Sequence, residues 1–131
     1  MTMQSKSQRA VVVALALAGV LALTPTRAAA HHGWSGNFDE EFQLSGTLET
    51  DVSLGGPHGT MRVRAADGQV WDVTLAPGPR TDRAGLKPGI IPRGAQVTIS
   101  GHRNRDAKRF EIKTERVTWN GKTFDVYPDR H

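Results

Sequence analysis

The sequence predicts an all-β domain, mainly antiparallel, in which residues 31–131 form one small barrel. Two observations carry this prediction. Apolar and polar residues alternate with a period of two in several segments, whereas no stretch after residue 30 keeps a helical period. Two glycine-containing turn sequences, Asp67-Gly68 and Asn120-Gly121, separate alternating segments as in β-hairpins. About 100 residues are enough for one domain with a single hydrophobic core.

Residues 1–30 differ from the rest of the chain and are typical of a cleaved secretory signal peptide. Basic residues precede an apolar run at 11–23, which is shorter than the roughly 20 residues that span a bilayer. Ala28 and Ala30 supply the small residues that signal peptidase requires. The sequence therefore predicts export to the periplasm, or secretion beyond it, and a mature chain that starts at His31 without a membrane span.

The charge of the precursor comes mostly from this export segment. The whole chain has 17 basic and 13 acidic side chains, and its pI of about 10.0 would suggest a nucleic-acid partner. Cleavage after residue 30 leaves 14 basic against 13 acidic side chains, and a near-neutral exported protein does not support nucleic-acid binding. The chain has no cysteine, which excludes disulfides, thiolate metal sites, c-type haem and blue copper.

The first two strands are predicted over residues 42–54 and 60–65. Most even positions of the first segment carry apolar residues or glycine, and its odd positions carry polar residues. Met61, Val63 and Ala65 continue the pattern in the second segment. One face of each strand is therefore expected to point into the barrel.

The loop of the first hairpin is predicted from the pairing that it would impose. A three-residue loop at 66–68 places Val63 opposite Trp71 and Met61 opposite Val73, so that one face stays apolar. A two-residue loop would place an apolar side chain opposite a charged one. We therefore predict the three-residue loop, with glycine in its left-handed position.

The second half of the domain contains a short helix, a loop and a second hairpin. Residues 81–86 are expected to form the helix and 87–94 the loop, whereas alternation predicts strands around 97–101, 110–112 and 117–119. Five or six strands with one helical insertion favour a closed or partly open barrel, OB-like, over a sandwich. The second hairpin pairs Trp119 with Lys122, Val117 with Phe124, and Arg116 with Asp125 across a two-residue loop.

The predicted mature start, His31-His32-Gly33-Trp34, has the donors of a copper site. An amino-terminal histidine offers its α-amine and its imidazole Nδ1 together, and His32 offers a second binding mode through the intervening backbone amide. Nitrogen donors in a tetragonal arrangement favour Cu(II) or Ni(II). The alternative is that histidines at a chain terminus have no function.

His58 is the candidate for a third nitrogen ligand. It lies between glycines in Gly55-Gly56-Pro57-His58-Gly59, at the entrance to the second strand and on the outward face. The alternative is a solvated turn histidine.

Other residues are assigned structural roles. We expect His102 in a solvated hairpin loop beside cations, His131 at a frayed terminus and the acidic run 39–41 in solvent. Trp34 is expected to pin the N-terminal segment to the barrel. Met61, the one methionine that remains after cleavage, is expected to be buried.

Several segments of the mature chain together carry a resemblance to a known family. They are Ala30 to Ser35, Leu44 to Leu48, Gly56-Pro57-His58, Leu75-Ala76-Pro77 with Arg80 and Arg83 to Leu86, Val97 to Gly101, and Glu115-Arg116-Val117 with Asn120-Gly121-Lys122. In these the chain resembles the small exported bacterial proteins of domain-of-unknown-function family 6152. That family has no established activity, so the resemblance implies export and the fold. Members of that family usually have asparagine at the position of Gly56. The asparagine side chain could orient the following histidine, and this chain lacks it.

The sequence leaves two classes of function open. The first is carriage or buffering of a divalent transition metal, Cu(II) before others, through His31 and His58 with His32 as an auxiliary ligand. The second is a metal-free module whose barrel face, with Trp71, Arg62 and Arg64, engages a protein or glycan of the cell envelope, or serves as an accessory to a membrane complex. Since no hydrolytic or phosphoryl-transfer motif occurs, we do not expect an enzyme; the alternative is oxidative chemistry at an open equatorial position of a nitrogen-ligated copper ion. We expect a monomer.

Overall fold

The computed structural model describes residues 34–130 of the chain. The predicted signal peptide, the two histidines His31 and His32, and the terminal His131 lie outside the described residues. All structural statements below concern residues 34–130.

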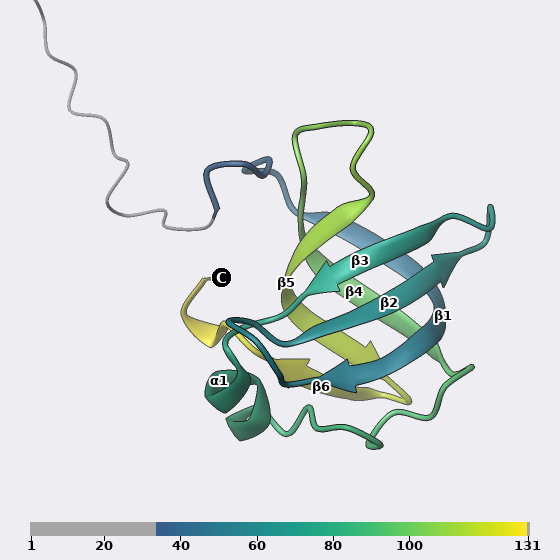
Figure 1. The fold of residues 1–131 in the computed structure, drawn as a ribbon, viewed down its shortest axis with the longest axis vertical. Coiled ribbons are helices and arrows are strands. Elements are labelled where there is room, and N and C mark those ends of the chain that lie inside the picture. Colours follow the sequence, from purple (N-terminus) through teal and green to yellow (C-terminus); the bar gives the residue numbers. More distant parts are fainter. Residues whose placement is uncertain (1–33, 131) are drawn as a thin grey trace, which may run out of the picture.

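The described residues form a closed, mostly antiparallel β-barrel (Figure 1). The sheet order is β3-β2-β1-β4-β5-β6, and a further pairing between β3 and β5 closes the barrel. That closing pair is parallel, whereas the other strand pairs are antiparallel. The strands are β1 (Phe42–Ser53), β2 (Thr60–Ala65), β3 (Val70–Thr74), β4 (Gln96–Arg103), β5 (Glu111–Trp119) and β6 (Lys122–Asp125).

The connectivity confirms the predicted small OB-like barrel with one helical insertion. Five strands follow the cyclic order β1-β2-β3-β5-β4, and the short helix α1 (Gly78–Arg83) lies between β3 and β4. Local alternation did not predict the parallel pairing of β3 with β5. It joins residues 72–74 to 111–113, and such long-range pairings leave no local sequence signal.

Both hairpin registers are confirmed. Val63 lies opposite Trp71 and Met61 opposite Val73, and Gly68 has the positive φ of 86° that the three-residue loop requires. In the second hairpin the pairs are Trp119 with Lys122, Val117 with Phe124, and Arg116 with Asp125.

The helix begins earlier than the predicted 81–86. Pro79 lies in its first turn, a position that proline tolerates because the amide there has no partner inside the helix. Gly85 follows the helix with φ of 88°, so its left-handed conformation ends the helix before Leu86. The segment 87–94 is a loop, as predicted.

The hydrophobic core fills the barrel and extends to its helical end. Inward residues of all six strands contribute, as the period-two pattern predicted for the first strands. Met61 is buried as expected, with 2% of its surface exposed. The fully buried side chains with the largest volume are Phe124, Leu48, Met61, Leu75, Leu86, Ile91, Ile99 and Ile112.

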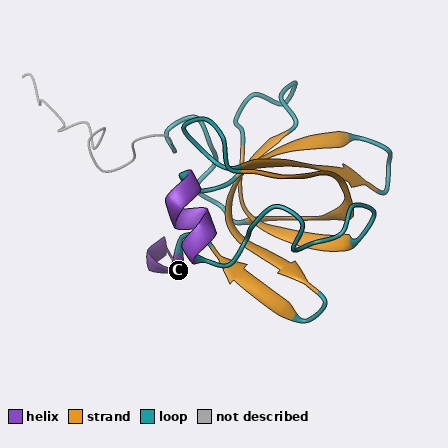
Figure 2. Cartoon of the chain, turned by 60° about the horizontal axis from the view of Figure 1, so that its bottom comes forward, coloured by secondary structure: helices purple, strands orange, loops and turns teal. Residues whose placement is uncertain are grey.

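The two ends of the described chain cover one side of the barrel. Figure 2 shows α1 and the C-terminal 3-10 helix (Pro128–Arg130) side by side at this side of the molecule. An ion pair joins Arg80 of α1 to Asp129, at 3.7 Å between Nη2 and Oδ1. The N-terminal segment 34–38 hydrogen-bonds to the end of β4 and the loop after it, through Phe38 N to Arg103 O and Arg105 N to Gly36 O, both 2.9 Å. The candidate site lies beside these covering segments.

Candidate functional site

His58 lies in the loop between β1 and β2 and is half-buried. Two backbone hydrogen bonds hold the end of this loop against the segment after β3. Gly59 N donates to Ala76 O and Leu75 N donates to Gly59 O, both at 2.8 Å. A Cβ atom at Gly59 would lie 3.2 Å from the Thr81 hydroxyl, so the close approach of the loop to α1 favours glycine there. The loop therefore fixes the backbone on which His58 is carried.

The surroundings of His58 lower its pKa below the usual 6.5. Partial burial is the larger cause, because it disfavours the charged imidazolium, and the positive charge of Lys113 adds to it. A lowered pKa leaves the imidazole neutral at pH 7, which is the form that binds metal ions.

Lys113 on β5 is close to both His58 and the start of the described chain. Its Nζ lies 5.1 Å from the centroid of the Trp34 ring. Burial, the largest cause, lowers the pKa of Lys113, the carboxylate of Glu111 acts in the opposite direction, and Arg130 lowers it further. Lys113 therefore acts on the His58 imidazole and also contacts the Trp34 ring.

Trp34 packs into a cluster of charged and aromatic side chains, as the predicted pinning role requires. The guanidinium carbon of Arg130 lies 4.0 Å from its ring centroid. His102 and Tyr127 contact it edge to face, at centroid distances of 5.5 and 5.2 Å. Together with Lys113, these contacts hold the indole on the outside of β4 and β5, and the ring is half-buried against the core.

The prediction that His102 lies in a solvated hairpin loop is wrong. His102 belongs to β4, and 8% of its surface is exposed. Its Nδ1 lies 2.9 Å from the Phe38 carbonyl oxygen and its Nε2 lies 2.7 Å from Glu115 Oε1. Both ring nitrogens are occupied, so His102 is not placed to act as a metal ligand. The error arose because segment 34–38 covers a strand face that a barrel would otherwise expose.

A β-bulge in β5 brings Glu115 to this outer face. On β4, Ser100 pairs with Arg116 and the next residue, Gly101, pairs with Thr114. Glu115 is therefore the extra residue of the bulge. The sequence contained a signal for this bulge, because the apolar phase changes from even at Ile112 to odd at Val117. A change of phase within one strand indicates an inserted residue, and sequence reasoning missed it.

The acidic run 39–41 is exposed, as expected. Glu41 forms an ion pair with Arg116 on β5. The run contributes no ligand to a cluster with His58 in the described residues.

Within residues 34–130, no three histidine, cysteine, aspartate or glutamate side chains form a group suited to hold a metal ion. Of the three predicted ligands, His58 is described, whereas His31 and His32 are not. His31 is three residues before Trp34, and three extended residues span about 10 Å.

Trp71 does not share a face with Arg62 and Arg64, so this part of the predicted binding face is wrong. Trp71 points into the barrel with 6% of its surface exposed and stacks on Phe42 at 5.4 Å between centroids. The arginines lie on the outer face, where Arg62 Nε pairs with Asp72 at 3.0 Å and Arg64 Nη2 pairs with Glu49 at 2.7 Å.

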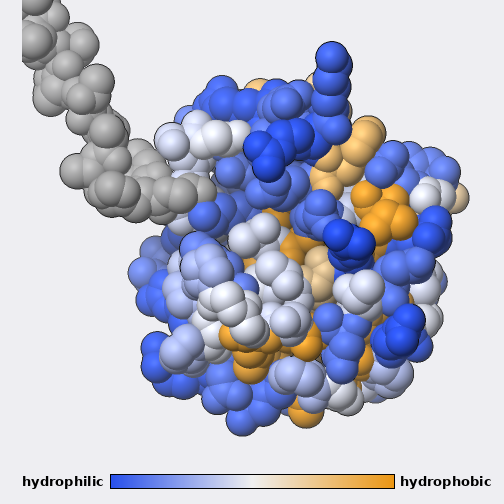
Figure 3. All heavy atoms as spheres, viewed as in Figure 1, coloured by the Kyte–Doolittle hydropathy of each residue, from blue (hydrophilic) through white to orange (hydrophobic). Residues whose placement is uncertain are grey.

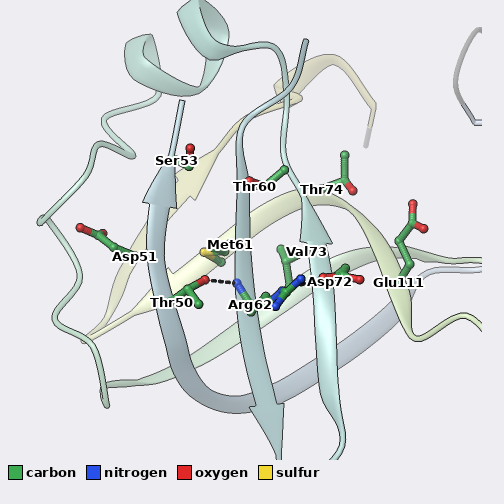
Figure 4. A pocket seen from close by; sticks show the side chains of 10 residues that line it. All are labelled: Thr50, Asp51, Ser53, Thr60, Met61, Arg62, Asp72, Val73, Thr74 and Glu111. Atoms are coloured by element: carbon green, nitrogen blue, oxygen red, sulfur yellow. Dashed lines mark hydrogen bonds and ion pairs between the residues drawn. The ribbon is translucent and has the colours of Figure 1, made fainter. Parts of the chain in front are cut away.

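The outer face of β1, β2 and β3 carries a groove of about 450 Å³, most of whose lining residues have polar side chains (Figure 4). The Arg62–Asp72 pair lies across it, and the Arg62 amide donates to the Thr50 hydroxyl at 3.0 Å. In Figure 3, hydrophilic residues predominate on the visible face of the molecule and apolar residues occur in small, separate patches. The groove is lined by Thr50, Asp51, Ser53, Thr60, Met61, Arg62, Asp72, Val73, Thr74 and Glu111.

Comparisons with known proteins add little to this description. A comparison with models of known families and one with curated proteins each found no match to the chain. Among solved structures, a ZRD-deleted mutant of TiaS in complex with agmatine aligns with a TM-score of 0.48 and 11% sequence identity. The alignment covers 66% of this chain and 26% of that one. The fold described above rests on the strand pairings alone.

None of the helices within residues 34–130 has the length and apolar character needed to cross a membrane.

Proposed function

We propose that this chain is an exported protein of the periplasm that binds one divalent transition metal ion, with a preference for Cu(II), and carries or buffers it. The ligands are the α-amine and imidazole of His31 together with the imidazole of His58, with His32 as an auxiliary ligand. The proposal includes cleavage of the signal peptide after Ala30, because only cleavage there gives His31 a free α-amine. It also includes membership of family 6152, which the resemblance of the mature chain suggests.

The observation that supports this proposal is the position of Trp34. Its ring lies 5.1 Å from Lys113 Nζ, and Lys113 is near enough to His58 for its charge to lower the pKa of that imidazole. His31 is three residues from Trp34, which limits its distance from that residue to about 10 Å. Lys113 thus links the surroundings of His58 to the residue that lies three positions after His31, which supports His58 as the further ligand of a copper ion bound by His31.

The electrostatics of the neighbourhood both favour and oppose a metal ion. The lowered pKa of His58 reduces competition from protons at neutral pH. The ammonium group of Lys113 repels a divalent cation, which weakens binding. Weaker binding suits a protein that must release its metal.

A competition titration with Cu(II) tests the proposal. The mature protein beginning at His31 is compared with one carrying an additional alanine before His31, with His58→Ala and with the control His131→Ala. Blocking the amine site or removing His58 should each raise the dissociation constant at least about tenfold, whereas the control should leave it unchanged. Equal affinities in all four proteins would refute the site.

Cleavage itself is tested by sequencing the N-terminus of the protein recovered from the periplasm. A start at His31 is expected. A start at any other residue would remove the amine ligand and, with it, the proposed site.

The groove on the barrel face supports a second candidate function. OB-like barrels bind extended ligands on the face of their second and third strands, and here that face carries hydroxyl, carboxylate and guanidinium groups around Arg62. Titration with soluble peptidoglycan fragments should then shift the NMR signals of Thr60, Arg62 and Asp72, with or without the additional N-terminal alanine. Unchanged spectra at these residues would refute a glycan ligand.

A further inference from the structure

His102 joins segment 34–38 to the outer face of β5, and the proposed function does not use it. The residue is 8% exposed. Its Nδ1 lies 2.9 Å from the Phe38 carbonyl oxygen, and its Nε2 lies 2.7 Å from Glu115 Oε1. A carbonyl and a carboxylate have no proton to donate, so both act as acceptors. The two hydrogen bonds therefore form together only when the His102–Glu115 pair holds one proton more than a neutral imidazole beside a carboxylate.

Loss of this additional proton leaves a single N–H for two acceptors. If the N–H stays on Nδ1, the lone pair of Nε2 faces the carboxylate of Glu115, which is 4% exposed, and the two repel each other. If the N–H is on Nε2, the bond to the carboxylate is kept and the bond to the Phe38 carbonyl is lost. A hydrogen bond to a charged acceptor is about twice as strong as one to a neutral acceptor, so the second tautomer is favoured. The contact that breaks is the one with segment 34–38.

The groups around the pair act on this proton in opposite directions. The carboxylate of Glu115 favours it. Two cations oppose it, namely Lys113, opposite His102 in the β4–β5 ladder, and Arg130, whose Nε lies 3.4 Å from Glu115 Oε1. Burial raises the pKa of the Tyr127 phenol, which therefore stays neutral where a histidine loses its proton. Further charged residues of the surrounding elements are Arg103, Glu111, Arg116, Asp129 and the acidic run 39–41. Their balance sets the pH of the change, and the geometry sets its direction.

The other hydrogen bonds of segment 34–38 to β4 and the loop after it do not depend on a proton that histidine could lose. Asn37 Nδ2 donates to the His102 carbonyl at 2.7 Å, and Arg105 Nε donates to the Asn37 carbonyl at 3.0 Å. The remaining bonds join backbone amides to backbone carbonyls. Amide and guanidinium groups keep their protons across the range in which histidine titrates. The contact between His102 and Phe38 is therefore the pH-dependent part of this attachment.

We propose that the His102–Glu115 pair is a proton-dependent clasp: it holds segment 34–38 on the outer face of β4 and β5 while it keeps its additional proton, and it loosens the segment when that proton is lost as the pH rises. Detachment exposes the outer side of His102 and removes the Trp34 ring from its contact with the imidazole, 5.5 Å between centroids. The clasp therefore controls access to this face of the barrel. It involves no metal ion.

The test is NMR of the mature protein without metal, with ¹⁵N in the histidine rings. Nδ1 of His102 should carry a proton at about pH 5 and lose it by about pH 9, where the proton is on Nε2. The protection factors of the Phe38 and Arg105 amides, which donate to Arg103 O and Gly36 O, report attachment of the segment. They should fall at least about tenfold over this range, after correction for the intrinsic exchange rate at each pH. A proton on Nδ1 at both pH values with unchanged protection would overturn the proposal.

Glu115→Gln is the sharpest variant, because it should keep the segment attached at high pH. The glutamine amide can donate to His102 Nε2 while its Oε1 accepts from Arg130. A neutral ring with its proton on Nδ1 then satisfies both neighbours, so the bond to the Phe38 carbonyl persists. Protection at Phe38 should stay within about twofold between about pH 5 and about pH 9. A fall as large as that of the wild type would overturn the role of the carboxylate.

Two controls assign the response to this pair. Glu49→Gln removes a glutamate from an ion pair with Arg64 on the outer face of β1 and β2, and His58→Ala removes the other described histidine. Both should respond to pH as the wild type does, and loss of the response in either would contradict the assignment. Lys113, whose pKa burial lowers, is present in every variant, so a response caused by its own titration would persist in Glu115→Gln. Urea unfolding at both pH values establishes that each variant is folded.

Discussion

Both faces of the β4–β5 pair carry buried residues, but for different reasons. On the inner face, Ile99, Ile112 and Val117 are fully buried in the hydrophobic core. On the outer face, His102, Lys113 and Glu115 are between 4% and 8% exposed although all three are polar or charged. The inner face is covered by the rest of the barrel, and the outer face by segment 34–38 and the C-terminal helix.

The inner face therefore contributes mainly to the stability of the barrel, and the outer face mainly to the position of the covering segments. Burial of apolar surface stabilises the inner face by about 25 cal/mol per Å². Burial of charged groups costs desolvation free energy, which good geometry only partly repays, so such pairs contribute more to a defined arrangement than to stability. We therefore expect changes on the inner face to unfold the barrel and changes on the outer face to release the covering segments.

Gly101→Ala should have the largest effect, because Gly101 lies at the bulge and directly against the backbone of β5. A Cβ there would lie 2.1 Å from the Lys113 carbonyl oxygen, and backbone would have to move. We expect a loss of more than about 3 kcal/mol in the free energy of unfolding, measured in urea. Gly36→Ala, where a Cβ would meet nothing within 4 Å, is the control and should change stability by less than about 0.5 kcal/mol. Similar values for the two variants would contradict the strand contact.

Ile112→Ala tests the inner face alone. The side chain is fully buried, so its loss removes apolar contacts and leaves a cavity. The free energy of unfolding should fall by about 3 kcal/mol. Amide exchange at Phe38 should rise only as far as global unfolding explains. A selective rise there would show that the two faces are not independent.

Local patterns predicted the hairpin registers of the inner face, although Trp71 was also assigned to a binding face, and they did not predict the burial on the outer face of β4 and β5. Alternation and turn geometry predicted both hairpin registers, such as Val63 opposite Trp71, because each depends on neighbouring residues. Burial of His102 depends on segment 34–38, which is more than 60 residues away in the chain. No local pattern reports such a contact, although the change of phase between Ile112 and Val117 did mark the bulge.

Thr114→Val should stabilise the protein. Thr114 is fully buried beside the bulge, and its hydroxyl has no hydrogen-bond partner among the described residues. Replacing this hydroxyl with a methyl group removes the cost of a buried polar atom and keeps the shape. A gain of about 1 kcal/mol in urea unfolding is expected. A loss of stability would show that the hydroxyl is satisfied.

The pKa of His58 offers the smallest but most local test of the site. NMR titration should give a value below 6.5, and Lys113→Met should raise it only part of the way back, because burial is the larger cause. Lys108→Met, in the exposed loop after β4, should leave it unchanged. Because the unfolded chain binds this proton more readily, His58 reduces stability as the pH falls below 6.5. A His58 pKa at or above 6.5 in the wild type would contradict its partial burial beside a positive charge.

Of the predicted metal ligands, His58 was placed correctly at the entrance to the second strand, but the sequence could not show what surrounds it. Its neighbour Lys113 comes from β5 through the parallel β3–β5 pairing, which local alternation did not predict. Trp34 was correctly expected to pin the N-terminal segment. Its partners Arg130 and Tyr127 come from the other end of the chain, and only the closed barrel brings the two ends together.

The central claim is that one copper ion is bound by both the N-terminal histidine and His58. Pulsed electron paramagnetic resonance of the mature protein with one equivalent of Cu(II) counts the coordinated imidazoles through their remote nitrogens. The account predicts at least two imidazoles in the wild type and one fewer in His58→Ala. The same number in both proteins would contradict it.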